Sequence, residues 1–217
     1  MKKLILFFCF TLSLSLFAQK EVEEGVMKLK VTMSSENEQV NASLAMIGDL
    51  NATTYFKSGK SRTEMSSNMT GSNTTIVDNE NKKLLVLMDN PMLGKKYLKQ
   101  DITNEETPKD VKVTENGETK TILGYDCKGY DLVTTQNGQE QKITMYVTDK
   151  IKAPNQNTVA AGDQIKGFPL LAIVTINQMG SPLTTTAEVI EITGEKVDDS
   201  KFDLTVPEGY DEMKVPK

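Results

Sequence analysis

The residue types that carry out most protein chemistry are scarce in this sequence. Its 217 residues include no His and no Trp, and the two Cys are Cys9 and Cys127. Histidine is the usual general base near neutral pH and the commonest metal ligand. The sequence also lacks a glycine-rich phosphate loop and a nucleophile-elbow motif. We therefore predict a protein that is not an enzyme and that needs no cofactor or metal ion.

Two polar features deserve a chemical interpretation. Arg62 is the one Arg of the chain, and its planar guanidinium could bind a ligand carboxylate or phosphate. The alternative is an ion pair with a neighbour such as Glu64, which is the commoner role of a surface charge. Residues Asp78–Asn81 faintly resemble a calcium loop, but Lys82 stands where a ligand is needed, so we prefer a hairpin turn there.

The chain begins with the pattern of a signal peptide. Lys2 and Lys3 precede an apolar run, Leu4–Phe17, and Ala18 follows as a small residue at the cleavage position. We predict cleavage after Ala18, giving a mature chain that starts at Gln19 and is exported to the periplasm or out of the cell. A signal anchor is the alternative, but the run is shorter than the roughly 20 apolar residues of a membrane-spanning helix. We expect no transmembrane segment after cleavage.

Loss of this segment changes the cysteine content and the charge. Cys9 leaves with it, so Cys127 becomes the only cysteine in an oxidising compartment and cannot form an internal disulfide. We interpret Cys127 as a small buried hydrophobe. The net charge falls from −5 to −7 because two Lys are lost, and such an acidic protein is not expected to bind nucleic acid. We expect a single domain over residues 19–217, present as a monomer.

Hydrophobic residues alternate along most of the mature chain, which predicts strands. Turn residues separate them, and consecutive hairpins imply an antiparallel sheet of about ten strands. The uninterrupted apolar run Leu84–Met88 predicts a strand covered on both faces. The predicted hairpin turns are Ser58-Gly59-Lys60, Asn79–Lys82, Asn116-Gly117, Gln136–Gln139 and Met179–Pro182.

One segment reads as a helix. Ser35 and Glu38 have capping-box spacing, and Val40, Leu44 and Ile47 then follow at helical intervals, which predicts a short helix over residues 36–47. The alternation of apolar residues in this segment leaves a strand as the alternative. A loop is predicted over residues 149–167, with a helical turn near 158–161.

Four segments resemble a pattern found in uncharacterised secreted proteins of the Bacteroidota, a family defined by a domain of unknown function. That family resembles the periplasmic lipoprotein carriers (LolA/LolB-like), so the resemblance implies a mainly β (α+β) fold. In such a fold a curved antiparallel sheet or half-barrel has its concave face covered by one or two short helices. No catalytic residues come with it. Gly124 and Gly129 would mark bends or bulges in a long curved strand, and Pro169 a strand start. The four segments are Tyr55–Arg62, Glu118–Lys128, Lys166–Leu170 and Phe202–Tyr210.

This resemblance leads to two functional hypotheses; a third, an enzyme that uses paired carboxylates as in glycoside hydrolysis, is disfavoured by the missing catalytic groups. In the first, the concave face binds an acyl chain, a lipid, or a lipidated peptide or lipoprotein, and the predicted helix forms a lid. In the second, the protein is a structural or interaction component of the cell envelope with no small ligand. The ten Met of the mature chain suit either an adaptable apolar site or a core poor in aromatic rings. The candidate binding residues are Leu44, Met46 and Ile47 in the lid, Phe168, Leu170 and Leu171 in the floor, and Arg62.

Overall fold

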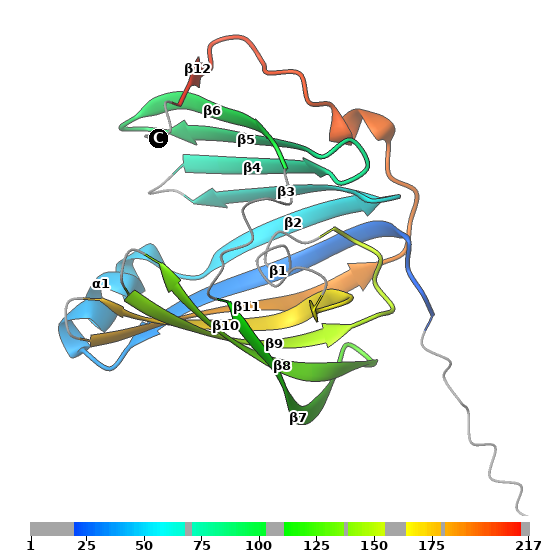
Figure 1. Ribbon diagram of the computed structural model, residues 1–217. Coiled ribbons are helices and arrows are strands. Elements are labelled where there is room, and N and C mark those ends of the chain that lie inside the picture. Colours follow the sequence, from blue (N-terminus) through cyan, green and yellow to red (C-terminus); the bar gives the residue numbers. More distant parts are fainter. Residues whose placement is uncertain are drawn as a thin grey trace, which may run out of the picture.

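In the computed structural model, the described chain folds into one curved open sheet of twelve strands (Figure 1). The structure describes residues 20–67, 71–102, 111–136, 139–154, 164–178 and 181–213. The predicted signal peptide and the helical turn near 158–161 lie outside these ranges. Within them, no helix is long and apolar enough to cross a membrane. The strands are β1 (Glu24–Ser35), β2 (Leu50–Lys57), β3 (Lys60–Ser67), β4 (Gly71–Asp78), β5 (Lys83–Asn90), β6 (Gly94–Asp101), β7 (Lys112–Ile122), β8 (Tyr125–Gln136), β9 (Gln139–Thr148), β10 (Phe168–Gln178), β11 (Ser181–Thr193) and β12 (Asp211–Glu212).

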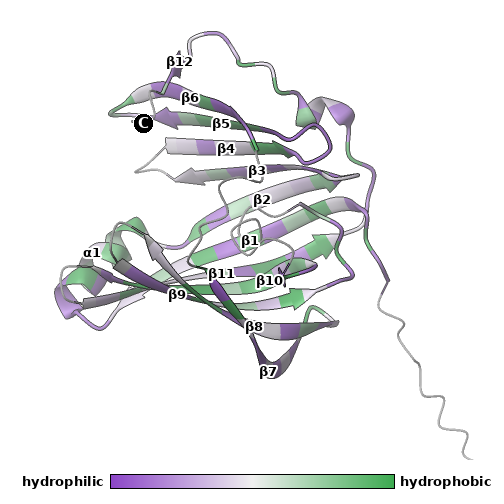
Figure 2. Cartoon of the chain, in the orientation of Figure 1, coloured by the Kyte–Doolittle hydropathy of each residue, from purple (hydrophilic) through white to green (hydrophobic). Residues whose placement is uncertain are grey.

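The strand order follows from two runs of hairpins that meet in the middle. The order is β12-β6-β5-β4-β3-β2-β1-β11-β10-β9-β8-β7, so β1 and β11 join the run β2–β6 to the run β7–β10. All pairs are antiparallel except β12 with β6. The predicted antiparallel architecture is confirmed, but twelve strands exceed the expected ten. One strand that the sequence did not predict is β12, which has only two residues and is too short for a hydrophobic alternation. Figure 2 shows β10 as largely hydrophobic and the edge strand β7 as largely hydrophilic.

The predicted helix is present as α1 (Glu38–Ile47), and the strand alternative for this segment is wrong. Its N-cap is Asn37, not Ser35: the Asn37 side chain accepts hydrogen bonds from the backbone N–H groups of Gln39 and Val40, which helix geometry leaves unpaired. Ser35 instead ends β1. The helix packs against β1, but none of its residues is buried.

The turn between β7 and β8 differs from the prediction. It lies at Leu123-Gly124, whose φ angles of 50° and 82° suit a two-residue hairpin, so Gly124 occupies a turn and not a bend within a strand. The predicted turn at Asn116-Gly117 is wrong because this pair forms a bulge inside β7. The register shifts between Glu115 and Thr119, leaving three residues opposite Gly129. An Asn-Gly pair fits a bulge as well as a turn, since Gly117 has a φ of 77°.

The remaining hairpins follow the predictions. Ser58 and Gly59 form the β2–β3 turn with φ angles of 45° and 73°. Strand pairing confirms the β4–β5, β8–β9 and β10–β11 hairpins at the expected positions. Pro169 is the second residue of β10, close to the predicted strand start. The turn residues of the sequence therefore set most of the connections of the sheet.

Three clusters of buried side chains form the core. The largest joins strands from the middle of the sheet and includes Met27, Phe56 and Leu170, all fully buried. The second includes Leu132 and Met145. The third packs β4 and β5 against the C-terminal segment; its members are Ile76, Leu85 and Leu87, with Tyr97, Leu204, Val206 and Tyr210 around them. The expectation that residues 84–88 are covered on both faces holds in part, since Val86 and Met88 on the other face are only half-buried.

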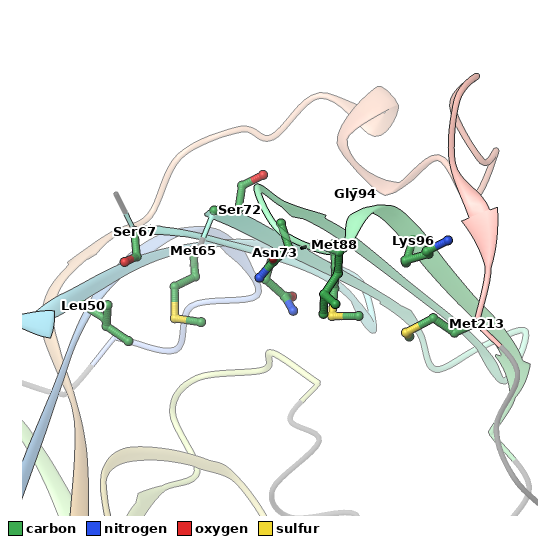
Figure 3. A pocket seen from close by; sticks show the side chains of 12 residues that line it. Leu50, Met65, Ser67, Ser72, Asn73, Met88, Gly94, Lys96 and Met213 are labelled. Atoms are coloured by element: carbon green, nitrogen blue, oxygen red, sulfur yellow. Dashed lines mark hydrogen bonds between the residues drawn. The ribbon is translucent and has the colours of Figure 1, made fainter. Parts of the chain in front are cut away.

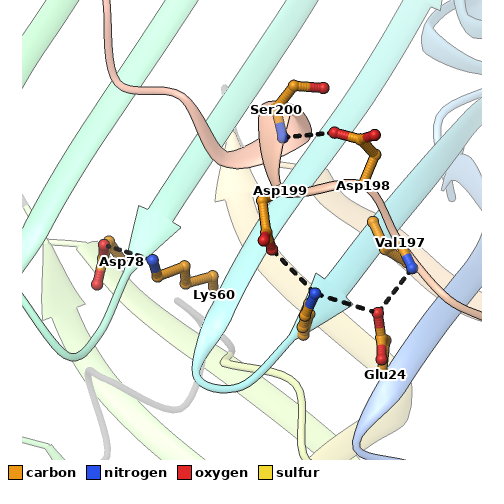
Figure 4. A network of polar contacts seen from close by, with 8 residues as sticks. Glu24, Lys60, Asp78, Val197, Asp198, Asp199 and Ser200 are labelled. Carbon is orange, nitrogen blue, oxygen red and sulfur yellow. Dashed lines mark hydrogen bonds and ion pairs between the residues drawn. The ribbon is translucent and has the colours of Figure 1, made fainter.

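The C-terminal segment crosses the back of β2–β6 and is held there by polar contacts (Figure 4). Glu24 accepts a hydrogen bond from the backbone N–H of Val197 at 2.7 Å. Lys57 forms an ion pair with Asp199 at 2.9 Å. Asp198 caps the 3₁₀ helix η3 (Asp199–Phe202) through the N–H of Ser200. These contacts direct the segment toward β6, where it pairs as β12.

Candidate functional site

An apolar pocket of about 260 Å³ lies on the face of β2–β6 opposite to the one that η3 and Leu204 contact (Figure 3). We call this the inner face; it carries Ala52, Met65, Asn73, Met88 and Lys96. In Figure 3 the side chains of Met65, Asn73 and Met88 leave the sheet on this same side. The lining surface is mostly apolar. Its residues are Leu50, Met65, Ser67, Gly71, Ser72, Asn73, Met88, Asn90, Leu93, Gly94, Lys96 and Met213.

The register of four strands builds this inner wall. Met65 on β3 faces Asn73 on β4, which faces Met88 on β5, which faces Lys96 on β6. Residues directly opposite one another in antiparallel strands project from the same face. The four side chains therefore form one row across the sheet. A shift of one residue in any of these strands would move its member of the row to the other face.

The C-terminal segment supplies the wall at the sheet edge. Asp211 and Glu212 of β12 pair in parallel with Lys96 and Tyr97 of β6. The N–H of Met213 then donates to the carbonyl oxygen of Tyr97 at 2.8 Å. This places Met213 at the pocket, with its side chain pointing toward Met88 in Figure 3.

Gly71 allows the strands beside the pocket to approach closely. It starts β4 with a φ of 81°, and a Cβ at this position would lie 1.9 Å from the carbonyl oxygen of Asp89. Any larger residue would push β4 away from β5 at the end where the pocket opens. The local backbone of the pocket thus depends on a residue without a side chain.

One positive charge stands among the polar groups of the pocket. Lys96 Nζ lies 2.8 Å from the carboxylate of Asp211, which is exposed at the surface. The hydrogen bond and the charge of Lys96 lower the pKa of Asp211 below its ordinary value. Among the described residues that line the pocket, Lys96 alone carries a formal charge at neutral pH.

In the part of the chain that the structure describes, no group of three or more His, Cys, Asp or Glu could hold a metal ion. Asp78 accepts hydrogen bonds from the backbone and side chain of Asn81, as in a hairpin turn. Burial opposes the shift, but these bonds and Lys60 lower the pKa of Asp78. Cys127 is fully buried, and this burial raises the pKa of its thiol to about 11.

The predicted site residues lie elsewhere than the pocket. Leu44 and Ile47 are half-buried on α1, whereas Met46 is 77% exposed. Phe168 and Leu170 are buried in the largest core cluster, and Leu171 packs against it. None of these six residues is among those that line the pocket. The structure therefore does not bring the predicted lid and floor together at this cavity, and their ligand-binding role stays a prediction.

Arg62 lies on the face of the sheet opposite to the pocket, where its side chain is held by contacts within the protein. Its Nε lies 2.5 Å from the carboxylate of Glu64, which is the predicted ion pair. Its Nη1 also donates to the carbonyl oxygen of Lys201 at 3.4 Å, so Arg62 contacts the C-terminal segment. Sequence reasoning missed the pocket residues Leu50, Met65, Met88 and Met213. The high Met content was the one available signal, and it does not say which Met converge.

The fold places this chain in the class of mainly β proteins built on one curved open sheet. Within that class, the chain belongs to the family described as Domain of unknown function (DUF4412), which matches residues 24–210. No curated protein matches the chain.

The solved structures that are similar to the chain include the following two. A structure of PNGF-II has a TM-score of 0.48 and 16% identity; the match covers 87% of this chain but only 31% of that protein. The lipoprotein LppX of Mycobacterium tuberculosis has a TM-score of 0.33 and 10% identity, and the match covers 81% of this chain and 89% of LppX.

Proposed function

We propose that this protein is an exported, non-catalytic binding protein that takes up an apolar ligand, such as an acyl chain, in the pocket of its inner face. The observation that carries this proposal is the convergence of apolar side chains from β2, β3, β5, the β5–β6 turn and the end of the chain on one cavity. Removing apolar surface from water contributes about 25 cal/mol per Å² before the costs of association. These side chains are Leu50, Met65, Met88, Leu93 and Met213.

The size and composition of the pocket support one chain as the ligand. Its volume of about 260 Å³ lies just below the roughly 300–1,000 Å³ of pockets for drug-sized molecules. A single acyl chain suits this space better than a lipid with several chains. Met side chains are unbranched and flexible, so they adapt to ligands of varied shape.

One further feature agrees with this role. The signal-peptide pattern of residues 1–18 supports export to the periplasm or the exterior, where acyl chains of the envelope are available.

A second candidate is an interaction protein of the envelope, which one observation favours. Met92 and Leu93 form the tip of the β5–β6 hairpin, and they are 91% and 69% exposed. Exposed apolar side chains at a loop tip are suited to contact with a partner protein or lipoprotein. Leu93 also lines the pocket, so such contact would take place at its mouth.

Native mass spectrometry of the mature protein, purified gently from cell envelopes, separates these candidates. We expect an adduct with the mass of an acyl-chain compound that extracts into organic solvent. Met88→Asp should lower its occupancy because the acid lies on the inner wall. Ile190→Asp, which places the same acid at an exposed strand position outside the pocket lining, should not. A protein without adduct, beside a control lipid complex that survives the same conditions, would contradict ligand binding.

A further inference from the structure

Lys96 is placed where it can select the headgroup of a ligand. It lines the pocket at the β6 rim, next to the apolar wall formed by Met88. Its side chain is 35% exposed, and its ammonium is paired with Asp211 of β12. In Figure 3 this end of the side chain is turned away from Met88, so it stands at the rim and not within the cavity. A charge at the rim of an apolar pocket suits a ligand that has one charged end.

We infer that the ligand is a single-chain amphiphile with an anionic headgroup, whose head binds Lys96 and whose chain lies along the inner wall toward Met65. This inference rests on the proposed function and specifies its ligand class. A carboxylate or sulfate would accept a charge-assisted hydrogen bond from the ammonium. A cationic headgroup at the same rim would be repelled by the positive charge of Lys96.

The length of the row of wall residues fits such a ligand. Lys96, Met88, Asn73 and Met65 stand on four consecutive strands. Adjacent strands are about 4.8 Å apart, so the row spans about 14 Å, which an extended chain of medium length covers. Asn73 is the uncharged polar member of the row, and its side-chain Oδ1 accepts a hydrogen bond from the hydroxyl of Thr75.

Asp211 competes with the proposed headgroup for Lys96. The two side chains form an ion pair at 2.8 Å, and Asp211 is 78% exposed. A lysine ammonium has three donors, so it can bind an anion without releasing Asp211, but the two negative charges then repel each other. Neutralising Asp211 should therefore strengthen anion binding, whereas neutralising Lys96 should weaken it.

The test uses calorimetric titration of the mature protein with decanoate and with decyltrimethylammonium, both below their micelle concentrations. We expect the wild type to prefer decanoate. Lys96→Gln should weaken decanoate binding by about threefold to tenfold, a modest factor because the pair is partly solvated. Asp211→Asn should tighten it. Lys99→Gln should leave it unchanged, since Lys99 bonds to the carbonyl oxygen of Leu204 on the opposite face of the same strand.

The possible outcomes separate this inference from the proposed function. Equal binding of both probes, or a preference for decanoate that persists in Lys96→Gln, would overturn the headgroup assignment and leave chain binding intact. Binding of neither probe would contradict the proposed function itself. If Lys96→Gln proved unstable in thermal unfolding, Lys96→Arg decides: retained preference for decanoate supports the assignment, and loss of preference in a folded Arg variant contradicts it.

Discussion

Lys96 Nζ and Asp211 Oδ2 are 2.8 Å apart, and this ion pair joins the inner face of β6 to the two-residue strand β12. A backbone hydrogen bond also connects the two elements, because the N–H of Met213 donates to the carbonyl oxygen of Tyr97. The end of the described chain thus covers part of the β6 edge and also provides one wall of the pocket. Ligand binding and the attachment of the C-terminal segment are expected to influence each other through this contact.

The first prediction concerns the titration of Asp211. Lys96 lowers the folded-state pKa of this carboxyl group by a hydrogen bond and by its charge. A lowered pKa stabilises the fold above the unfolded value of about 3.9, and this contribution is lost as the pH falls through the folded value. We expect the carboxyl carbon of Asp211, followed by NMR, to titrate below its ordinary range, and to move up toward that range in Lys96→Gln. The same titration midpoint for Asp211 in the wild type and in Lys96→Gln would contradict the ion pair between Lys96 and Asp211.

A second prediction tests the bulge in β7. A Cβ on residue 129 would lie 2.2 Å from Oδ1 of Asn116, whose side chain also donates to Asp131. Gly129→Ala should lower the free energy of unfolding by about 1–3 kcal/mol in urea denaturation, because the bulge must move. Asn116→Ala removes the obstacle, so the double variant should lose less than the sum of the two single variants. Additive losses would show that the two residues do not interact.

The general fold was predictable because its signals are local. Period-two alternation indicates strands such as β1, and turn residues such as Ser58-Gly59 indicate the hairpins. The misplaced turn at Asn116-Gly117 shows the limit of this reasoning. The same dipeptide suits a turn or a bulge, and the bulge here faces Gly129 on the neighbouring strand, where a Cβ would meet Asn116. β12 was missed because its pairing is with β6 and not with a sequence neighbour.

A third prediction concerns Leu170, which sequence reasoning placed in a binding site and which the structure places in the core with no exposed surface. Leu170→Ala should destabilise the protein by about 2–5 kcal/mol, the usual cost of a cavity in a packed core. Denaturant unfolding measures this loss, and the folded fraction should still bind decanoate as the wild type does. Loss of decanoate binding with an unchanged free energy of unfolding would show that Leu170 belongs to the ligand site and not to the core.

The thiol of Cys127 gives a fourth prediction. The residue has no exposed surface, and burial raises its pKa to about 11. Because the thiolate is the nucleophile, the native protein should not react with iodoacetamide near neutral pH, whereas the unfolded protein should. Because the pKa of the Cys127 thiol is raised in the folded state, the free energy of unfolding should decline as the pH rises from the ordinary thiol range toward about 11. Rapid labelling of the native protein at neutral pH would contradict this burial.

The pocket was less predictable than the sheet for a physical reason. An inward-facing Met has the same sequence pattern in a sealed core and in an open cavity, so Met145 and Met88 look alike although only Met88 lines the pocket. Whether a side chain is covered depends on segments that pack from elsewhere. Met213 is the extreme case, since it reaches the pocket through a two-residue strand near the end of the chain.

The most direct test of the central claim is photo-crosslinking with a decanoic acid that carries a diazirine, followed by peptide mass spectrometry. We expect labelled residues in β3 and β5 near Met65 and Met88, with labelling suppressed by excess unlabelled decanoate. Labelling that is concentrated on α1 or on residues 168–171, or that excess decanoate does not suppress, would contradict the assignment of the pocket as the ligand site.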